Sequence, residues 1–327
     1  RSSVHAGPVM AERGPLLFLM GPTASGKTGL AVDLVARGIG EILSVDSAMV
    51  YRGMDIGTAK PDAATLAAAP HALIDLRDPA DAYSAADFVA DADREVARIR
   101  ANGRLPILTG GTSMYFRAFE HGLSALPGRD PVIRARLTAE AETIGWASLH
   151  ARLAAADSKT AGRIHPNDAQ RIQRMLEILE ITGETPSVLH TRDAGRRIDD
   201  AIIKIIVCPD RRDALHARIA QRFDQMMEYG FLAEVEKLHA RPDLDLTQPS
   251  IRSVGYRQLW QVLDGKHDLV TGRALAVTAS RQLAKRQLTW LRSLSNAHWL
   301  DSQARDNRSR VEALIEQFTT GADAQRA

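Results

Sequence analysis

Residues 21–28, Gly-Pro-Thr-Ala-Ser-Gly-Lys-Thr, have the G-x-x-x-x-G-K-[ST] spacing of a phosphate-binding loop. The glycines let successive backbone N–H groups turn inward around a phosphate, and the N-terminus of a following helix adds a partial positive charge. Lys27 supplies a full positive charge, and the Thr28 hydroxyl suits Mg²⁺. The motif therefore predicts binding of a di- or triphosphate, without specifying which one or that it is a nucleotide.

A second chemical cluster, Asp46-Ser47, directly follows a short apolar run at 41–45. In an open parallel sheet, ligands bind outside the carboxyl ends of the strands, so Asp46 is expected beside the phosphate-binding loop. There it would act as a general base or a magnesium partner, or it would only cap the next turn; the residue by itself favours neither role. The segment that continues to Pro61 mixes glycines and charges, as active-site loops do.

A third cluster, Gly110-Gly111-Thr112, follows the apolar run at 105–109. A nucleotide hydrolase with a phosphate-binding loop usually carries an acidic residue at the end of such a strand, to hold magnesium. Two glycines and a hydroxyl suit the close approach of a substrate instead. This difference argues against an ATPase or a GTPase.

The elements that must position these clusters alternate between strands and helices. Strands are predicted at 16–20, 41–45, 72–76, 105–109, 202–208 and 298–300, and helices at 29–36, 84–102, 211–229, 232–240 and 272–293. The stretch between them is helical only, with helices at 131–144, 146–156 and 167–182. The predicted fold class is α/β: a parallel sheet flanked by helices, like that of P-loop NTPases, with an all-helical insertion domain.

Domain boundaries follow from the same pattern. We expect a flexible tail at 1–14, the first part of the core at 15–125, a helical insertion at 126–200, the second part of the core at 201–318 with basic C-terminal helices, and a frayed tail at 319–327.

Composition excludes several classes of protein. The 327 residues are 45% hydrophobic and 25% charged, which argues against a disordered chain. No apolar run approaches the ~20 residues needed to span a bilayer, and the one cysteine, Cys208, rules out an internal disulfide framework. We therefore expect a cytoplasmic protein with no membrane contact. The net charge of +2 does not by itself indicate a nucleic-acid partner, which must rest on local clusters.

The predicted helix at 272–293 contains such a cluster, because it carries basic residues and no acidic one. Arg281, Lys285 and Arg292 share one side at helical spacing, and the opposite side, with Ala279, Leu283 and Trp290, is expected to face the core. A solvated face is the commoner explanation of such a stripe. Contact with RNA phosphates is the alternative.

Taken together, these segments resemble the tRNA dimethylallyltransferases, also called tRNA isopentenyltransferases. The resemblance rests on residues 21–28, on the string DSAMVYRGMDIGTAKP at 46–61, on 110–112, and on later segments at 165–168, 170–171, 222–223, 251–256 and 282–287. It covers nearly the whole chain and is most specific in the 46–61 string. It implies the bacterial form, without the C-terminal zinc finger of many eukaryotic members.

The family transfers a dimethylallyl group from dimethylallyl diphosphate to N6 of the adenosine 3′-adjacent to the anticodon of certain tRNAs, and diphosphate leaves. The resemblance therefore implies that the phosphate-binding loop holds a diphosphate leaving group rather than ATP. It implies Mg²⁺ as the cofactor and the tRNA anticodon stem-loop and dimethylallyl diphosphate as partners. We expect the enzyme to be a monomer. The resemblance also makes contact with RNA phosphates the preferred explanation of the basic helix, ahead of a solvated face.

The resemblance also assigns roles to individual residues. It makes Asp46 the general base, with Thr112 and Arg222 as the other catalytic residues. The implied diphosphate site comprises Gly21, Thr23, Ala24, Ser25, Gly26, Lys27, Thr28 and Arg222, with the metal at Thr28. The resemblance implies that the helical insertion at 126–200 contacts tRNA. The implied tRNA site comprises Asp46, Ser47, Ala48, Met49, Thr112, Arg134, Gln170, Arg171, Arg174, Ile251, Arg252, Gly255, Tyr256, Arg281, Lys285 and Arg286.

Three other functions stay open. A small-molecule kinase would bind ATP in the loop and use Asp46 to hold the acceptor hydroxyl, but it leaves the 46–61 string unexplained. A non-catalytic RNA-binding protein would keep only a residual loop. A prenyltransferase that acts on free adenine nucleotides would share the chemistry, although the long insertion and the basic helix favour tRNA.

Overall fold

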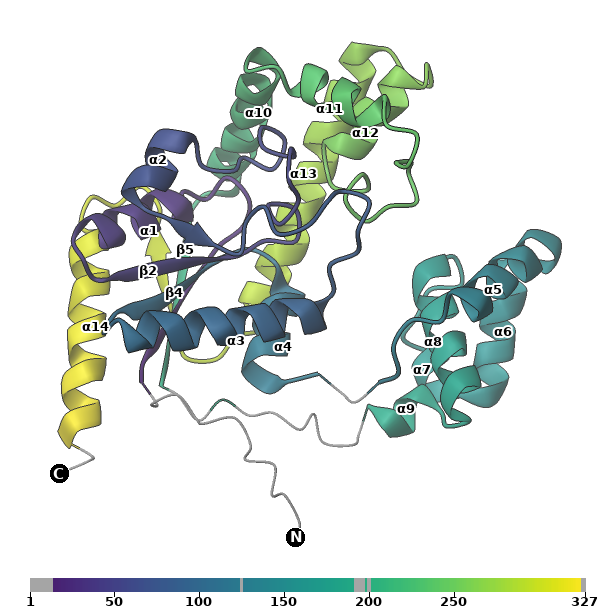
Figure 1. Ribbon diagram of the computed structural model, residues 1–327, viewed down its shortest axis with the longest axis horizontal. Helices are drawn as coiled ribbons and strands as arrows, with labels where there is room; N and C mark the ends of the chain where they lie inside the picture. Colours follow the sequence, from purple (N-terminus) through teal and green to yellow (C-terminus); the bar gives the residue numbers. More distant parts are fainter. Residues whose placement is uncertain (1–13, 124–125, 191–197, 199–200, 325–327) are drawn as a thin grey trace, which may run out of the picture. The chain divides into compact units, whose positions relative to one another are not determined.

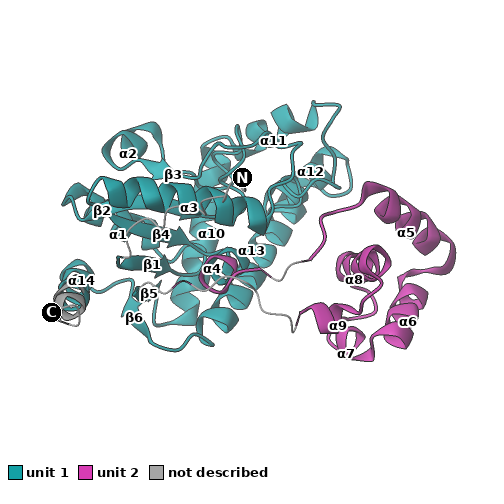
Figure 2. Ribbon diagram, turned by 60° about the horizontal axis from the view of Figure 1, so that its bottom comes forward, with its two compact units in different colours: residues 1–117, 199–327 teal, residues 118–198 magenta. Residues whose placement is uncertain are grey.

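The computed structural model describes residues 14–123, 126–190, 198 and 201–324. The chain divides into two compact units, residues 1–117 with 199–327, and residues 118–198 (Figure 2). Apart from Gly14, the predicted tail at 1–14 lies outside the described residues. So do residue 125, where the predicted first part of the core ends, and residues 199–200, where the predicted insertion ends.

The first unit is built on a parallel sheet whose strand order, within the described residues, is β3-β2-β4-β1-β5-β6 (Figure 1). The strands are β1 Leu16–Met20, β2 Gly40–Val45, β3 His71–Ala72, β4 Leu105–Gly110, β5 Ile202–Cys208 and β6 Ala297–Asp301. All residues of β1 are buried, as expected for an apolar run between two helical layers. Gly110 pairs with both Met20 and Val45, so β1, β2 and β4 end at one level and their loops meet at one edge of the sheet.

Helices cover both faces of this sheet. They are α1 Lys27–Ala36, α2 Ala63–Ala68, α3 Ala85–Ala101, α4 Ser113–His121, α10 Arg212–Glu228, α11 Phe231–His239, α12 Tyr256–Leu263, α13 Leu269–Leu291 and α14 Asn307–Ala324. On one face, α1 and α14 contribute Leu34 and Val311 to a core with Leu17 of β1. On the other face, Phe18 of β1 packs on Phe116 of α4, with ring centroids 5.0 Å apart. The alternating residues of β1 thus join both layers to the sheet.

The third predicted strand, 72–76, is wrong in its extent. β3 ends at Ala72, and the next residues include Leu73 and Asp75 with φ of +67° and +55°, a backbone conformation that no strand continues. The backbone N–H groups of Leu76 and Arg77 then donate to the carbonyl oxygen of Val50. The apolar pattern therefore belongs to a loop that packs beside the 46–61 segment.

The predicted frayed tail at 319–327 is also wrong in part, because α14 continues through Ala324. Phe318 of this helix packs against the sheet core, which explains why the helix does not end at the small polar residues. Residues 325–327 lie outside the described residues. Helices α2, α4, α12 and α14 have no counterpart among the predicted elements.

The buried face of helix α13 extends from the predicted side toward the basic side chains. Gly272 and Ala276 are buried on the predicted side, whereas Val277, Ala284 and Leu291 lie beside the basic side chains. Arg281 is accordingly half-buried. The predicted buried side differs from the observed one because the helix lines one cavity on each flank. The flank with Leu283 is therefore only half-buried.

The second unit consists of helices, and its described residues contain no strand. The helices are α5 Pro131–Ile144, α6 Trp146–Ala156, α7 Ser158–Ala161, α8 Ala169–Thr182 and α9 Pro186–Leu189. They enclose a separate hydrophobic core that includes Leu137, Leu149, Leu153 and Leu176. The bounds of α5 and α6 agree with the predicted helices, since Asp130 accepts hydrogen bonds at the start of α5 and Gly145 separates the two.

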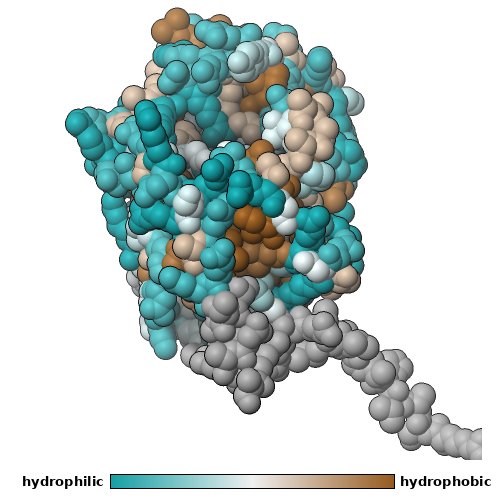
Figure 3. Space-filling model, turned by 90° about the vertical axis from the view of Figure 1, so that its left-hand side faces the viewer, coloured by the Kyte–Doolittle hydropathy of each residue, from teal (hydrophilic) through white to brown (hydrophobic). Residues whose placement is uncertain are grey.

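The surface is that of a globular protein. The face drawn in Figure 3 is mainly hydrophilic, with hydrophobic side chains in small patches. Of the helices within the described ranges, none is long and apolar enough to cross a membrane.

Candidate active site

The phosphate-binding loop joins β1 to α1. Gly26 has a φ of +92° directly before α1 begins at Lys27, a conformation that a side chain would strain. The turn places the N-terminus of α1 at the carboxyl edge of the sheet. The N–H groups of the first helical turn have no carbonyl partner within the helix, so they can bind a ligand. The local structure is therefore suited to an anion, as the motif predicts.

Two cationic side chains converge on this loop. Lys27 Nζ donates to the carbonyl oxygen of Pro22 at 3.2 Å, and Arg222 approaches from α10 without a hydrogen bond to any described residue. Burial and the neighbouring Arg222 lower the pKa of Lys27 to about 8, although Asp46 opposes the shift. Burial also lowers the pKa of Arg222, again opposed by Asp46. A bound anion would relieve this mutual destabilisation, so the pair is suited to an anionic ligand.

Asp46 stands at the end of β2 and both caps a turn and faces the cavity. Its Oδ1 accepts hydrogen bonds from the N–H groups of Ala48 at 2.8 Å and Met49 at 3.2 Å. Its Oδ2 has no hydrogen-bond partner among the described residues, and the side chain lines a cavity with Lys27 and Arg222. One oxygen of Asp46 thus holds the turn, and the other is available to a ligand.

The three predicted loops are tied to one another. Ser47 N–H donates to Thr112 Oγ1 at 3.2 Å, and Thr112 N–H donates to the carbonyl oxygen of Val45 at 3.3 Å. Gln287 of α13 completes the connection: its Oε1 accepts from Thr23 N–H at 2.9 Å, and its Nε2 donates to the Gly111 carbonyl at 3.0 Å. The role of Gln287 was missed by the sequence reasoning, because nothing in the basic pattern of α13 points to it.

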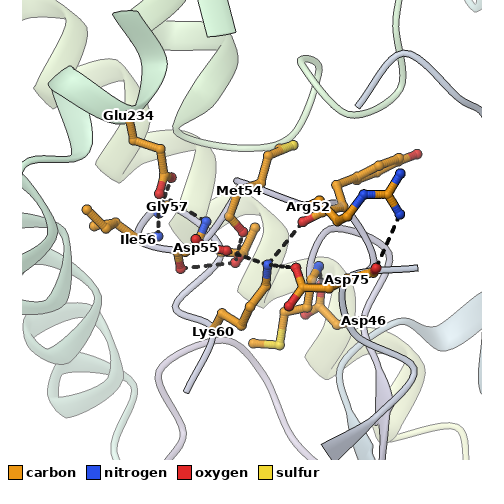
Figure 4. Close-up of polar contacts among 12 residues, drawn as sticks. Asp46, Arg52, Met54, Asp55, Ile56, Gly57, Lys60, Asp75 and Glu234 are labelled. Atoms are coloured by element: carbon orange, nitrogen blue, oxygen red, sulfur yellow. Dashed lines mark hydrogen bonds and ion pairs between the residues drawn. The ribbon is translucent and has the colours of Figure 1, made fainter. Parts of the chain in front are cut away.

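Polar contacts of two side chains, Lys60 and Glu234, hold the segment at 50–61 in place (Figure 4). Neither Lys60 nor Glu234 was predicted as a site residue. Glu234 accepts from backbone N–H groups of the segment, and Lys60 donates to the Tyr51 carbonyl and to Asp55 and Asp75.

These loops surround a cavity of about 550 Å³. Most of the predicted diphosphate and reaction residues line it, namely Thr23, Ala24, Lys27, Thr28, Asp46, Thr112 and Arg222. Among the predicted tRNA residues of this unit, those that line it further are Ser47, Ala48, Met49, Arg252, Tyr256 and Arg286. Gly21, Ser25, Gly26, Ile251, Gly255, Arg281 and Lys285 are not among the lining residues.

The predicted tRNA residues outside the cavity have different surroundings. Ile251 and Gly255 are buried, and Gly255 is the N-cap of α12. Tyr256 is fully buried although it borders the cavity, and its hydroxyl already donates to Glu234 Oε1 at 2.5 Å. Lys285 is exposed and lines a second cavity, beside β5 and β6. Their direct contact with RNA stays a prediction.

In the second unit, two of the predicted tRNA residues serve a buried carboxylate. Glu177 is fully buried and accepts hydrogen bonds from Arg134 Nε at 2.7 Å and from Arg174 at 2.6 Å. Gln170 and Arg171 are exposed on α8, and Arg171 makes only a 3.5 Å ion pair with Asp168. Arg171 therefore has the freest cationic group of the predicted set in this unit.

The lowered pKa of Glu177 predicts that the second unit loses stability in acid. Burial raises the pKa of this carboxyl, but hydrogen bonds from Arg134, Arg174 and the N–H of Asp130 outweigh burial and lower the pKa to about 2. A lowered folded-state pKa stabilises above the ordinary value of 4.5, and this contribution is lost as the pH falls toward 2. Glu177→Gln should cost about 3 kcal/mol at pH 7 and much less near pH 2.

Urea unfolding of both proteins at pH 7 and at decreasing pH measures this difference. Glu142→Gln, an exposed carboxylate on α5, is the matched control and should change little. An equal gap between Glu177→Gln and the wild type at every pH would contradict the prediction.

The cavity also has oxygen-bearing side chains that suit magnesium. Among the described residues, no group of three or more His, Cys, Asp or Glu side chains could hold a metal ion. Mg²⁺ usually takes one or two protein oxygens and completes its shell with water and phosphate oxygens. Thr28 and Asp46 both line the cavity and offer such oxygens. The residues therefore fit a magnesium ion that is held jointly with a diphosphate.

The sequence was compared with known protein families and proteins. The family model described as IPP transferase matches residues 49–294. A tRNA dimethylallyltransferase of Alkalilimnicola ehrlichii is 57% identical over 294 residues, which are 89% of this chain and 92% of that protein. A tRNA dimethylallyltransferase of Thioalkalivibrio sulfidiphilus is 53% identical and covers 94% of this chain and 97% of its own.

Solved structures agree in fold. The full-length tRNA isopentenylpyrophosphate transferase from Bacillus halodurans superimposes with a TM-score of 0.69 at 36% identity, covering 95% of this chain and 100% of that chain. A eukaryotic dimethylallyltransferase, solved acting on tRNA, has a TM-score of 0.74 at 23% identity over 92% of this chain and 78% of its own, a likeness in fold alone.

Proposed function

Since the chain belongs to the IPP transferase family of tRNA dimethylallyltransferases, we propose that its cavity transfers a dimethylallyl group from dimethylallyl diphosphate to N6 of an adenosine in tRNA. The observation that carries the proposal is the meeting of Lys27 and Arg222 with the open oxygen of Asp46 in one cavity. Two cations beside a carboxylate with an open oxygen are what a diphosphate leaving group and an amine nucleophile require.

The reaction then follows from these positions. The phosphate-binding loop, Lys27 and Arg222 bind the diphosphate, and they stabilise its growing charge as the allylic C–O bond breaks and the bonding electrons leave with it. The N6 nitrogen forms the new bond to the allylic carbon, and Asp46 Oδ2 accepts the proton that N6 loses. Thr112 fixes the Asp46–Ser47 turn. Mg²⁺, when bound at Thr28, would neutralise further charge on the departing diphosphate.

The RNA would be bound through its backbone and one extruded base. An adenosine stacked in an anticodon loop must leave its neighbours to enter a cavity, so we propose that the base 3′-adjacent to the anticodon is splayed into the space next to Asp46. Arg252 and Arg286 at the cavity, and Gln170 and Arg171 of the second unit, are the proposed contacts with the stem-loop. We further propose that the enzyme works as a monomer in the cytoplasm.

A transfer assay tests the proposal. Unmodified tRNA with an adenosine after its anticodon, radiolabelled dimethylallyl diphosphate and Mg²⁺ are mixed with the protein in the absence of ATP. Label should enter the tRNA, and transfer should weaken steeply with added salt because phosphate contacts release counterions. Absence of label, together with ATP consumption when small acceptors are supplied, would favour a kinase instead.

A further inference from the structure

Glu234 of α11 is a nearly buried carboxylate with an unusual set of partners. Its Oε2 accepts hydrogen bonds from the backbone N–H groups of Asp55 at 3.0 Å and Ile56 at 2.8 Å (Figure 4). Its Oε1 accepts from the N–H of Gly57 at 3.1 Å and from the Tyr256 hydroxyl at 2.5 Å. One side chain therefore fixes three consecutive amides of the 46–61 segment.

No cationic side chain among the described residues forms an ion pair with Glu234, whose exposed fraction is 9%. Burying a carboxylate is costly unless hydrogen bonds compensate, and an apolar residue in such a place often stabilises a fold equally well. Four donors on one carboxylate therefore point to a requirement for a particular backbone position rather than for stability. The group being positioned is the turn at 55–57.

Lys60 also holds this turn in place. The Lys60 side chain is 4% exposed, and its Nζ donates to the Tyr51 carbonyl at 3.0 Å, to Asp55 Oδ1 at 2.5 Å and to Asp75 Oδ1 at 2.6 Å. These bonds close the segment on itself and on the loop after β3. Glu234 and Lys60 together therefore restrain the turn.

The turn forms a wall of the reaction cavity. Gly57 lines the cavity, and a Cβ atom there would lie 2.0 Å from Phe231 Cε2 and 2.6 Å from Tyr256 Cε2. The backbone is therefore pressed against the aromatic rings of α11 and α12, with no room for a side chain. Thr58, the next residue, lines the cavity as well. A shift of the turn would change the shape of the space that holds the acceptor base next to Asp46.

We propose that Glu234 is a positioning residue for prenyl transfer: it fixes the 55–57 turn so that the cavity wall holds the adenine at Asp46. The inference rests on the proposed function and adds a residue that does not itself touch the reacting atoms. It makes a specific claim about substrates. The diphosphate is bound by the phosphate-binding loop, which is not part of this network, so loss of Glu234 should affect the RNA acceptor much more than the prenyl donor.

Glu234→Gln tests this claim, since the amide keeps the size but replaces one acceptor with a donor that opposes two of the four bonds. We expect kcat/KM for tRNA to fall about 10- to 100-fold. The KM for dimethylallyl diphosphate should change by less than about threefold, because Lys27 and Arg222 are untouched. Hydrogen exchange at amides 55–57 should accelerate while the rest of the first unit stays protected. Glu236→Gln, exposed on the same helix, is the control and should behave like the wild type.

Gly57→Ala displaces the same turn through contact with Phe231 and Tyr256 and keeps Glu234, so it provides a second test if Glu234→Gln folds poorly. The two variants should share one kinetic signature, and the double variant should be no worse than the poorer single one, since both act on one element. Wild-type exchange rates at 55–57 in Glu234→Gln with full activity would overturn the inference. Equal losses for both substrates would also overturn it. A wild-type protein that transfers no label would refute the proposed function instead. The hydrogen-exchange result would still test whether Glu234 fixes the 55–57 turn.

Discussion

Replacing Asp46 with alanine is expected to lower transfer to tRNA by about 10²- to 10⁴-fold, the range for loss of a general base. The exocyclic amine of adenine is a weak nucleophile, and its proton must be accepted as the new bond forms. Binding of tRNA should persist, because phosphate contacts supply most of the affinity for nucleic acid. Single-turnover transfer of radiolabel and filter binding of tRNA measure the two quantities.

Asp46→Asn separates the chemical role of this residue from its role in the fold. Asparagine Oδ1 can still accept the hydrogen bonds from Ala48 and Met49, so the turn should survive, but the amide cannot accept the N6 proton. Asp46→Asn should therefore be almost as inactive as Asp46→Ala. Asp33→Asn, at an exposed site on α1, is the control. An asparagine variant with near-normal rates would mean that Asp46 only caps the turn.

The parts of the site that are local in sequence were predictable. The phosphate-binding loop, Asp46 and Thr112 each follow an apolar run, and a parallel sheet brings the carboxyl ends of such runs together. The predicted parallel sheet with flanking helices and an all-helical insertion is confirmed. Motif and strand order together therefore determine which side chains meet, before any packing is known.

The parts that depend on distant residues were not predictable. Glu234 bonds to Ile56 across 178 positions, and Gln287 bonds to Thr23 across 264, so neither pairing leaves a periodic or local signal. The extent of β3 failed for a related reason, because Leu73 and Asp75 adopt positive φ to bring the next backbone groups to Val50. Arg134 and Arg174 look like RNA contacts in the sequence, yet the structure pairs them with Glu177, whose burial no local pattern predicts.

Replacing Lys27 with alanine is expected to lower kcat/KM for dimethylallyl diphosphate by about 10²- to 10³-fold, as loss of a preorganised donor to a developing anion does. Affinity for tRNA should be nearly unchanged, because Lys27 belongs to the phosphate-binding loop. Lys237→Ala, on an exposed part of α11, is the control for removal of a lysine. Steady-state kinetics with the prenyl donor varied at saturating tRNA measure the effect. Full activity of the variant would contradict the assignment of diphosphate binding to this loop.

The pH dependence tests the same residue without changing the wild-type protein. Because burial and Arg222 lower the pKa of Lys27 to about 8, the free enzyme loses this positive charge as the pH rises through that value. Only the protonated form attracts the diphosphate, so kcat/KM for the prenyl donor should fall above pH 8, and kcat/KM reports the free enzyme. Arg222 keeps its charge over this range, so the Lys27→Ala variant should lack this alkaline decline. A decline of the same size in that variant would assign the titration to another group.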